Sequence, residues 1–132
     1  MPRVVIVDDD VSVRRVLAPA LQRLGVDVVG EAGDGHEAIE VVCEVQPDVV
    51  LMDVRMPSMG GIEATREIKR LLPATEIVFV TVYDEPHPTR SAQEVGAYAY
   101  LLKDSSPELM RDVIVRAAAR KAEREVRDQR EA

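Results

Sequence analysis

Five polar residues of compatible chemistry directly follow four apolar runs of the 132-residue sequence: Asp8, Asp9, Asp53, Thr81 and Lys103. Carboxylates that lie close together repel one another and favour a hard divalent cation, and oxygen ligands with room for water suit Mg²⁺. A lysine ammonium would offset the remaining negative charge, and a threonine hydroxyl would donate a hydrogen bond. Together these groups would support phosphoryl transfer to an aspartate, a reaction that depends mostly on positioning and charge neutralisation.

Each of these residues also has an ordinary structural explanation. An aspartate at the end of a strand is usually a turn residue or a helix cap, and Asp10 is best interpreted as a cap or a solvent-facing charge. A single threonine there is usually structural, and a single lysine is usually a surface charge. The functional interpretation depends on the coincidence that four of five predicted strands carry a compatible group at the same edge.

Apolar runs alternate with helical patterns along the chain. The strongest apolar runs are residues 4–7, 49–52 and 77–80, and weaker runs are residues 26–29 and 98–102. Continuous apolar runs of this length are typical of strands buried on both faces. Helices are predicted from Ser12 to Leu24, from Asp34 up to Pro47, from about Ile62 to Leu72, from about Thr89 to Val95, and from Pro107 onward.

This alternation predicts an α/β fold of a single domain, with a strand–helix unit repeated five times. Such a chain forms a doubly wound parallel sheet with right-handed crossovers and helices on both faces. Ligands of these sheets bind beyond the carboxyl ends of the strands. The five polar residues are therefore expected to meet at that edge.

The charge and cysteine content exclude several classes of protein. The formal net charge is −7, and an acidic body lacks the cations that a nucleic-acid binder needs to neutralise phosphates. No apolar run approaches the roughly 20 residues that span a bilayer, and the N-terminus lacks the pattern of a signal peptide. Cys43 is the single cysteine, which suits a reducing compartment. We therefore expect a soluble cytoplasmic protein.

The motifs around these residues resemble the receiver domain of bacterial two-component response regulators. The resemblance covers about residues 3–120, and its most specific part is the string Leu-Met-Asp-Val-Arg-Met-Pro around Asp53, followed by Gly61. It implies a flavodoxin-like fold with the sheet order 2-1-3-4-5. It also implies that the chain is not an enzyme with an external substrate, and that it catalyses only its own phosphoryl acceptance and the hydrolysis of its aspartyl phosphate.

The resemblance assigns a role to each acidic residue of the site. Asp53 would accept a phosphoryl group from a sensor histidine kinase in a reaction that requires Mg²⁺. Asp9 would ligate the metal ion directly and Asp8 would do so through water. Asp53 itself and the backbone carbonyl of Arg55 would complete the protein ligands.

The resemblance also implies a conformational switch that responds to the phosphoryl group. Thr81 and Lys103 would contact the phosphoryl oxygens. Thr81 would shift towards them, and Tyr100, three residues before Lys103, would turn inward. Without the resemblance, Tyr100 would be interpreted as a half-buried strand aromatic with its hydroxyl in water.

Residues 96–104 are most similar to the NarL/FixJ (LuxR-type) branch of these regulators, whose members usually carry a DNA-binding helix-turn-helix after the receiver. The resemblance therefore implies control of transcription through a DNA-binding domain absent from this chain, with no contact between the receiver and nucleic acid. It also allows a homodimer. Pro86 and Pro88 precede the predicted fourth helix and argue against dimerisation through that face.

We assign residues 1–120 to the receiver and residues 121–132 to a charged helical tail or linker. The first interpretation of the tail is a solvated continuation of the last helix, because its charges have helical spacing. The second is a linker to an output domain or a helix that dimerises. Val126 alone would not form a coiled-coil seam, which needs apolar residues over several heptads.

Two other functions are compatible with the same residues. A stand-alone receiver could have lost phosphorylation and act only by protein–protein interaction, although the complete set of Asp9, Asp53, Thr81 and Lys103 argues against this. A Mg²⁺-dependent phosphatase would need a second acid/base carboxylate beside the nucleophile. Val54 and Arg55 occupy the positions after Asp53, so the sequence argues against a phosphatase as well.

Overall fold

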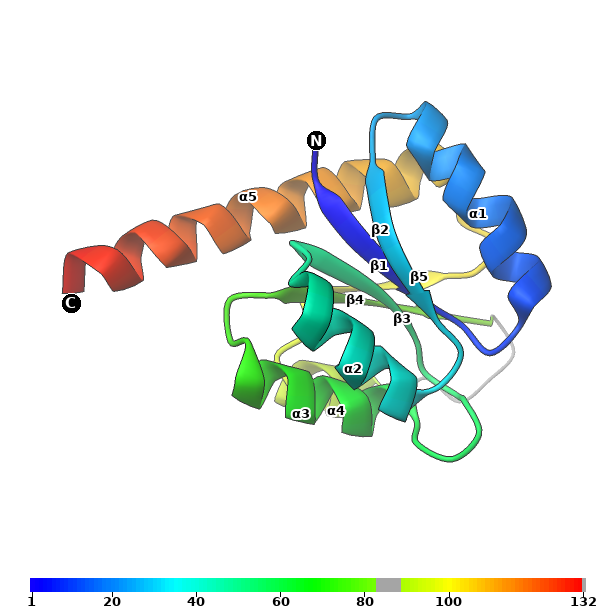
Figure 1. Ribbon diagram of the computed structural model, residues 1–132, viewed down its shortest axis with the longest axis horizontal. Helices are drawn as coiled ribbons and strands as arrows, with labels where there is room; N and C mark the ends of the chain where they lie inside the picture. The colour runs from blue at the N-terminus through cyan, green and yellow to red at the C-terminus, as the bar shows by residue number, and fades with distance from the viewer. Residues whose placement is uncertain (83–88, 132) are drawn as a thin grey trace.

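The computed structural model describes residues 1–82 and 89–131. Five parallel strands form a single sheet in the order β2-β1-β3-β4-β5 (Figure 1). The strands are β1 (Arg3–Val7), β2 (Asp27–Ala32), β3 (Val49–Asp53), β4 (Glu76–Thr81) and β5 (Ala99–Leu102). This is the predicted fold class with the predicted strand order.

Five helices connect and follow the strands among the described residues. They are α1 (Val11–Arg23), α2 (Gly35–Val45), α3 (Gly61–Leu71), α4 (Thr89–Glu94) and α5 (Pro107–Glu131). Helices α1 and α5 cover one face of the sheet, and α2, α3 and α4 cover the other (Figure 1). The sheet is therefore the middle of three layers.

The alternation of side chains along each strand produces two cores. Val4 and Ile6 of β1 pack with α1 and α5, whereas Val5 and Val7 pack with α2 and α3. Strands β3 and β4 are buried along their whole length, which explains the continuously apolar runs at residues 49–52 and 77–80. Strands β2 and β5 lie at the two edges and are only partly buried, so their apolar runs are weaker.

Several predicted element boundaries are shifted. Helix α1 begins at Val11, one residue before the predicted start at Ser12, and its N-cap is Asp10, whose carboxylate accepts from the Ser12 N–H at 2.9 Å. Strand β2 extends three residues further than its apolar run, since edge-strand residues need no apolar side chains. Pro86 and Pro88 lie outside the described residues, so the argument that they make against a homodimer stays a prediction.

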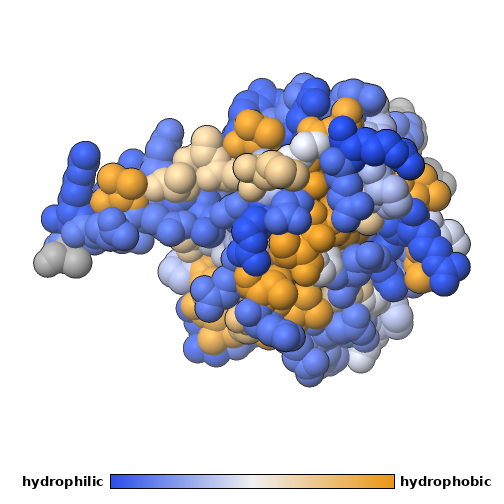
Figure 2. Space-filling model, turned by 45° about the horizontal axis from the view of Figure 1, so that its top comes forward, coloured by the Kyte–Doolittle hydropathy of each residue, from blue (hydrophilic) through white to orange (hydrophobic). Residues whose placement is uncertain are grey.

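Helix α5 continues without a break through the predicted boundary at residue 120 and ends at Glu131. Figure 1 shows that its C-terminal half extends beyond the sheet, and the visible surface of this part is mostly hydrophilic in Figure 2. Where the receiver unit ends and the tail begins stays a prediction. Among the described residues, no helix combines the length and apolar content that a membrane crossing requires.

Candidate functional site

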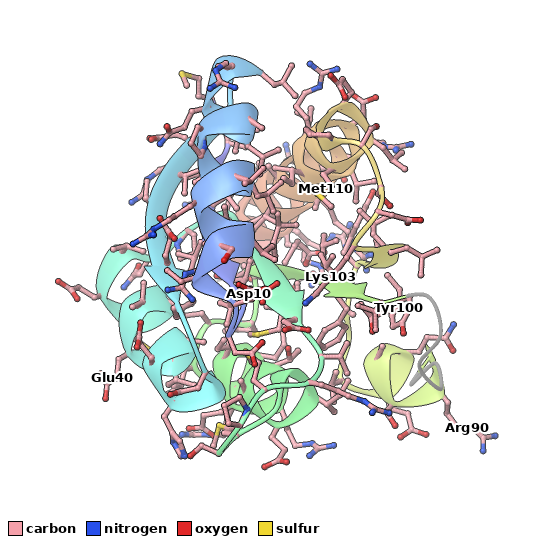
Figure 3. All side chains as sticks on the ribbon, turned by 90° about the vertical axis from the view of Figure 1, so that its right-hand side faces the viewer. Asp10, Glu40, Arg90, Tyr100, Lys103 and Met110 are labelled. Atoms are coloured by element: carbon pink, nitrogen blue, oxygen red, sulfur yellow. The ribbon has the colours of Figure 1, made fainter. Side chains whose placement is uncertain are left out.

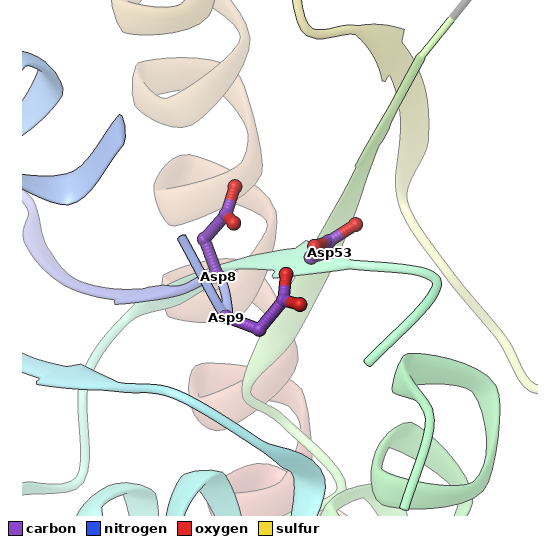
Figure 4. Close-up of side chains that lie close together, drawn as sticks. All are labelled: Asp8, Asp9 and Asp53. Carbon is purple, nitrogen blue, oxygen red and sulfur yellow. The ribbon is translucent and has the colours of Figure 1, made fainter. Parts of the chain in front are cut away.

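The register of the sheet brings the ends of β1 and β3 together. Val7 of β1 is paired with Met52 of β3. Asp8 follows Val7 and Asp53 follows Met52, so both aspartates lie at the same edge of the sheet. The carboxylates of Asp8, Asp9 and Asp53 each place an oxygen within 4.8 Å of the others (Figure 4). The predicted acidic cluster is therefore present at the carboxyl edge of the strands.

The members of this cluster differ in their contact with solvent. Asp8 and Asp53 are each 5% exposed, and Asp9 is exposed. Asp8 is held in place because its Oδ1 accepts from the Asp10 N–H at 2.9 Å. Asp10 is itself exposed, and the hydrogen bond from the Ser12 N–H lowers its pKa. One open carboxylate thus lies beside two buried ones, an arrangement that leaves room for water on one side of a bound ion.

Lys103 bridges the two buried carboxylates. Its Nζ lies 3.0 Å from Asp8 Oδ2 and 3.2 Å from Asp53 Oδ2. The backbone positions it, because the Lys103 N–H donates to the Thr81 carbonyl oxygen at 2.7 Å as β5 ends beside β4. Burial by itself lowers the pKa of this ammonium, but the hydrogen bonds and negative charges of Asp8 and Asp53 outweigh burial, so the pKa is raised. Lys103 is therefore a fixed positive charge at the site.

The pKa of the Asp53 carboxyl is raised to about 7. Burial is the main cause because it disfavours the ionised form, and the negative charge of Asp8 adds to it. Lys103 acts in the opposite direction through its charge and hydrogen bond, without cancelling the other two effects. Asp53 is therefore a carboxyl group that needs further positive charge to stay fully ionised at neutral pH.

The donor set and its charge fit a hard divalent cation. When all are ionised, the three carboxylates carry −3 and Lys103 carries +1, which leaves −2. A divalent cation balances this charge, and it would relieve the repulsion between Asp8 and Asp53. Carboxylate oxygens that converge from three residues suit Mg²⁺ better than they suit softer metals.

Gly61 lets the first turn of α3 lie against the backbone of Asp53. A Cβ at position 61 would lie 2.1 Å from the Asp53 carbonyl oxygen, a distance that no side chain can occupy. The Gly61 N–H donates to the Val54 carbonyl oxygen at 2.9 Å. The glycine therefore fixes the start of the β3–α3 connection, which also carries Arg55.

Comparison with known proteins agrees with this geometry. A family model described as the response regulator receiver domain matches residues 4–115. The chain belongs to the response regulator receiver family. As a receiver domain it is not a classical enzyme, and the predicted family is confirmed.

The receiver domain is similar to curated regulators along about half of their length. It is 44% identical over 119 residues to the uncharacterized transcriptional regulatory protein YxjL of Bacillus subtilis, covering 89% of this chain and 54% of that protein. It is 47% identical over 105 residues to the response regulator GacA of Pseudomonas viridiflava, covering 78% and 49%. The receiver therefore spans about half the length of these relatives.

Solved receiver structures have the same fold. The signal receiver domain of the putative response regulator NarL from Mycobacterium tuberculosis superposes with a TM-score of 0.82 at 37% identity, covering 89% of this chain and 96% of that one. Chemotaxis protein CheY4 of Vibrio cholerae superposes with a TM-score of 0.80 at 31% identity, covering 89% and 98%. The flavodoxin-like fold and the likeness to NarL and LuxR-type receivers are thus confirmed.

The structure places the three remaining predicted residues in different surroundings. Thr81 ends β4 and is 2% exposed. Tyr100 in β5 is half-buried and packs with the core on the α4 side of the sheet, and Figure 3 shows it on the side of α4. Arg55 lies two residues past Asp53 and is exposed. The switch role of Thr81 and Tyr100 and the ligand role of the Arg55 carbonyl stay predictions.

Sequence reasoning missed Arg14 of α1. Its guanidinium donates through Nη1 to the main-chain oxygen of Asp8, while Nε contacts Glu31 Oε1 at 3.1 Å. A charged residue in a helix is usually a solvated surface group, so its type and position alone carried no signal of this contact. The contact depends on how α1 packs beside the end of β2.

Proposed function

We propose that this receiver accepts a phosphoryl group on Asp53 from the phosphohistidine of a sensor histidine kinase, in a reaction that requires Mg²⁺. The observation that carries the proposal is the position of Asp53 among Asp8, Asp9 and Lys103, with Lys103 Nζ 3.2 Å from Asp53 Oδ2. These groups surround a nucleophilic carboxylate with charges in fixed positions, and their remaining negative charge favours the binding of a cation. Such positioning and neutralisation provide most of the catalysis in phosphoryl transfer.

The residues divide the work of the transfer among them. A carboxylate oxygen of Asp53 forms the new O–P bond while the donor's N–P bond breaks and the imidazole leaves. Asp8, Asp9 and Asp53, with the Arg55 carbonyl, would hold Mg²⁺, which supplies charge neutralisation for the phosphoryl oxygens when bound. Lys103 would contact one of these oxygens. Its contacts with Asp8 and Asp53 support this role because they already hold the ammonium beside the nucleophile.

The same arrangement supports a conformational switch as the output. Thr81 is joined to Lys103 through the 2.7 Å backbone hydrogen bond, and Tyr100 lies in β5, three residues before Lys103. A shift of Thr81 towards a phosphoryl group would therefore alter the position of Tyr100 and its packing with α4. Phosphorylation would bias a two-state equilibrium of this region.

Transcription is the output that the relatives support. YxjL is named a transcriptional regulatory protein, and this chain spans about half of its length. We therefore propose that the receiver controls a DNA-binding domain and does not contact DNA itself. Hydrolysis of the aspartyl phosphate by the receiver would end the signal.

Intact mass after incubation with Mg²⁺ and acetyl phosphate tests the phosphoryl acceptor. The wild type should gain one phosphoryl group, and Asp53→Asn should gain none. Asp104→Asn is the matched control, because it removes an exposed aspartate near the same edge of the sheet and should be labelled like the wild type. Equal labelling of Asp53→Asn, or an unlabelled wild type, would show that the proposal is wrong and would favour a receiver that acts only through protein–protein interaction.

A further inference from the structure

Arg14 connects helix α1 to the ends of two strands. Its Nη1 donates to the Asp8 carbonyl oxygen and lies 3.5 Å from the Ala32 carbonyl oxygen, at the end of β2. Its Nε lies 3.1 Å from Glu31 Oε1, and the arginine side chain is 16% exposed. This guanidinium is therefore held in one orientation by the main chain and by a carboxylate.

The contact with the Asp8 carbonyl affects Asp9. The carbonyl of Asp8 and the N–H of Asp9 belong to one planar peptide unit, so a bond to the first restricts the second. The rest of Asp8 is also fixed, because its N–H donates to the Ala32 carbonyl oxygen at 3.0 Å and its carboxylate contacts the Asp10 N–H and Lys103. Arg14 holds the carbonyl group of Asp8, which is the part of Asp8 that is joined to Asp9.

We propose that Arg14 is a positioning residue for the divalent-cation site. It holds the Asp8–Asp9 peptide plane, and thereby directs the exposed Asp9 carboxylate towards the buried carboxylates of Asp8 and Asp53. This inference rests on the proposed function for the identity of the ion. Fixing a metal ligand in advance strengthens binding, because less freedom is lost when the ion binds.

Glu31 completes this arrangement. A guanidinium near a cation site would repel the cation, and the Glu31 carboxylate at 3.1 Å offsets that charge. The planar fork of arginine reaches the carbonyl oxygens and the carboxylate at once, whereas a lysine ammonium is a single point charge. Lysine at this position would therefore keep a donor for the Asp8 carbonyl oxygen but lose part of the contact with the Ala32 carbonyl oxygen and the Glu31 carboxylate.

Calorimetric titration of the full chain with Mg²⁺ tests the proposal. Arg14→Met should weaken Mg²⁺ binding about tenfold at unchanged stoichiometry, as loss of a group that orients metal ligands typically does. Arg14→Lys should recover part of the affinity. Arg15→Met is the matched control, because Arg15 is the exposed neighbour on the same helix and carries the same charge. It should bind Mg²⁺ like the wild type.

Phosphorylation by acetyl phosphate provides a second readout that separates positioning from general damage. In Arg14→Met, the Mg²⁺ concentration for half-maximal labelling should rise about as much as the dissociation constant, by about tenfold. The maximal labelling rate at saturating Mg²⁺ should stay close to that of the wild type. A merely structural defect would lower the maximal rate as well, and lysine would not restore the affinity.

The inference is wrong if Arg14→Met and Arg15→Met bind Mg²⁺ with the same affinity. This holds whether that affinity equals the wild-type value or is lower by the same factor in both variants. If Arg14→Met fails to fold, Glu31→Gln decides, since the Glu31 side chain is 43% exposed and its loss should weaken Mg²⁺ binding in the same direction. Unchanged binding in Glu31→Gln would then overturn the inference. The proposed function fails separately, through an unlabelled wild type, and calorimetry still tests Arg14 in that case.

Discussion

Asp53 is subject to two opposing demands. Its proposed role as a nucleophile requires the ionised form, yet burial and the charge of Asp8 raise the pKa of this carboxyl to about 7. The nearby ammonium of Lys103 compensates only in part. Without a bound cation, the ionised Asp53 is therefore a source of instability in the folded state, and binding of a cation is favoured because it removes that instability.

Asp53→Asn should stabilise the protein at neutral pH in the absence of divalent cations. The pKa of Asp53 is higher in the folded state than the ordinary value of 3.8, so wild-type stability falls as the pH rises from about 4 to 7 and then levels off. Asparagine has no such dependence, and the variant should be more stable by about 2 kcal/mol at pH 8, after allowance for solvent screening. Urea unfolding between pH 5 and 8 measures the difference.

Saturating Mg²⁺ provides the control for this measurement. The ion should stabilise the wild type more than Asp53→Asn and so reduce the gap between them. An advantage of the variant that is the same at pH 5 and pH 8 would contradict the role of the raised pKa. Asp104→Asn, at an exposed position, should show no comparable gain.

Helix α3 begins directly against the end of β3, the strand that carries Asp53. Its N-cap is Gly60, which has no side chain to accept a capping hydrogen bond. The N–H of its first residue, Gly61, donates to the Val54 carbonyl oxygen. The position of the Asp53 backbone is therefore coupled to the first turn of a helix whose core-facing residues, including Ala64 and Ile68, are buried. A change at this turn is therefore expected to shift the Asp53 backbone.

Gly61→Ala should destabilise the protein by about 2 kcal/mol and slow the labelling of Asp53, because the added Cβ would push on the Asp53 carbonyl. Gly60→Ala is the matched control, since its Cβ would lie 3.2 Å from the Val54 carbonyl oxygen, a tight but tolerable contact. Urea unfolding and the rate of mass gain measure the two effects. Equal losses in both variants would show that Gly61 has no special relation to the site.

A second charged network ties α5 to the opposite end of the sheet. Glu76 at the start of β4 is fully buried, and its carboxylate lies 2.9 Å from Arg124 Nη1, 3.4 Å from Lys69 Nζ and 3.8 Å from Arg120 Nε. Burial lowers the pKa of Lys69, and the charge of Glu76 opposes that shift. The network joins α3, β4 and the part of α5 that extends beyond the sheet.

These contacts revise the description of the tail as a solvated continuation of the last helix. Helix α5 does run on to Glu131, but Lys121 Nζ lies 3.4 Å from Asp48 Oδ1, and Arg124 contacts Glu76. The first turns past residue 120 are therefore attached to the body by ion pairs. The orientation of α5 as it leaves the sheet is set by buried and partly buried charges rather than by apolar packing alone.

Glu76→Gln should destabilise the protein by about 2–3 kcal/mol, because it leaves a partly buried lysine and two arginines without their carboxylate. Amide hydrogen exchange in residues 118–131 should become faster, while exchange in β1 and β3 should change only with global stability. Glu94→Gln, at an exposed position of α4, is the control and should alter neither. Unchanged exchange of the tail would show that apolar packing alone holds α5.

Local patterns were sufficient for most of the architecture. The continuous apolar runs identified β1, β3 and β4 because strands buried on both faces need apolar residues at every position. The edge strands were less well delimited, and the start of α1 was placed one residue late, at Ser12. Both errors arise where solvent relaxes the requirement for a particular residue type, so that several assignments fit the same letters.

The sequence by itself determined the α/β class and which groups stand at the strand ends, because periodicity and the order of apolar runs are local properties. Tertiary structure decided which charges meet. Lys103 reaches Asp53 across 50 residues, and Glu76 reaches Arg124 across 48. Arg14 reaches the Asp8 carbonyl only because α1 packs beside the end of β2. Contacts of this kind depend on the sheet order, on the register and on how the helices pack, and these are set jointly by the whole chain.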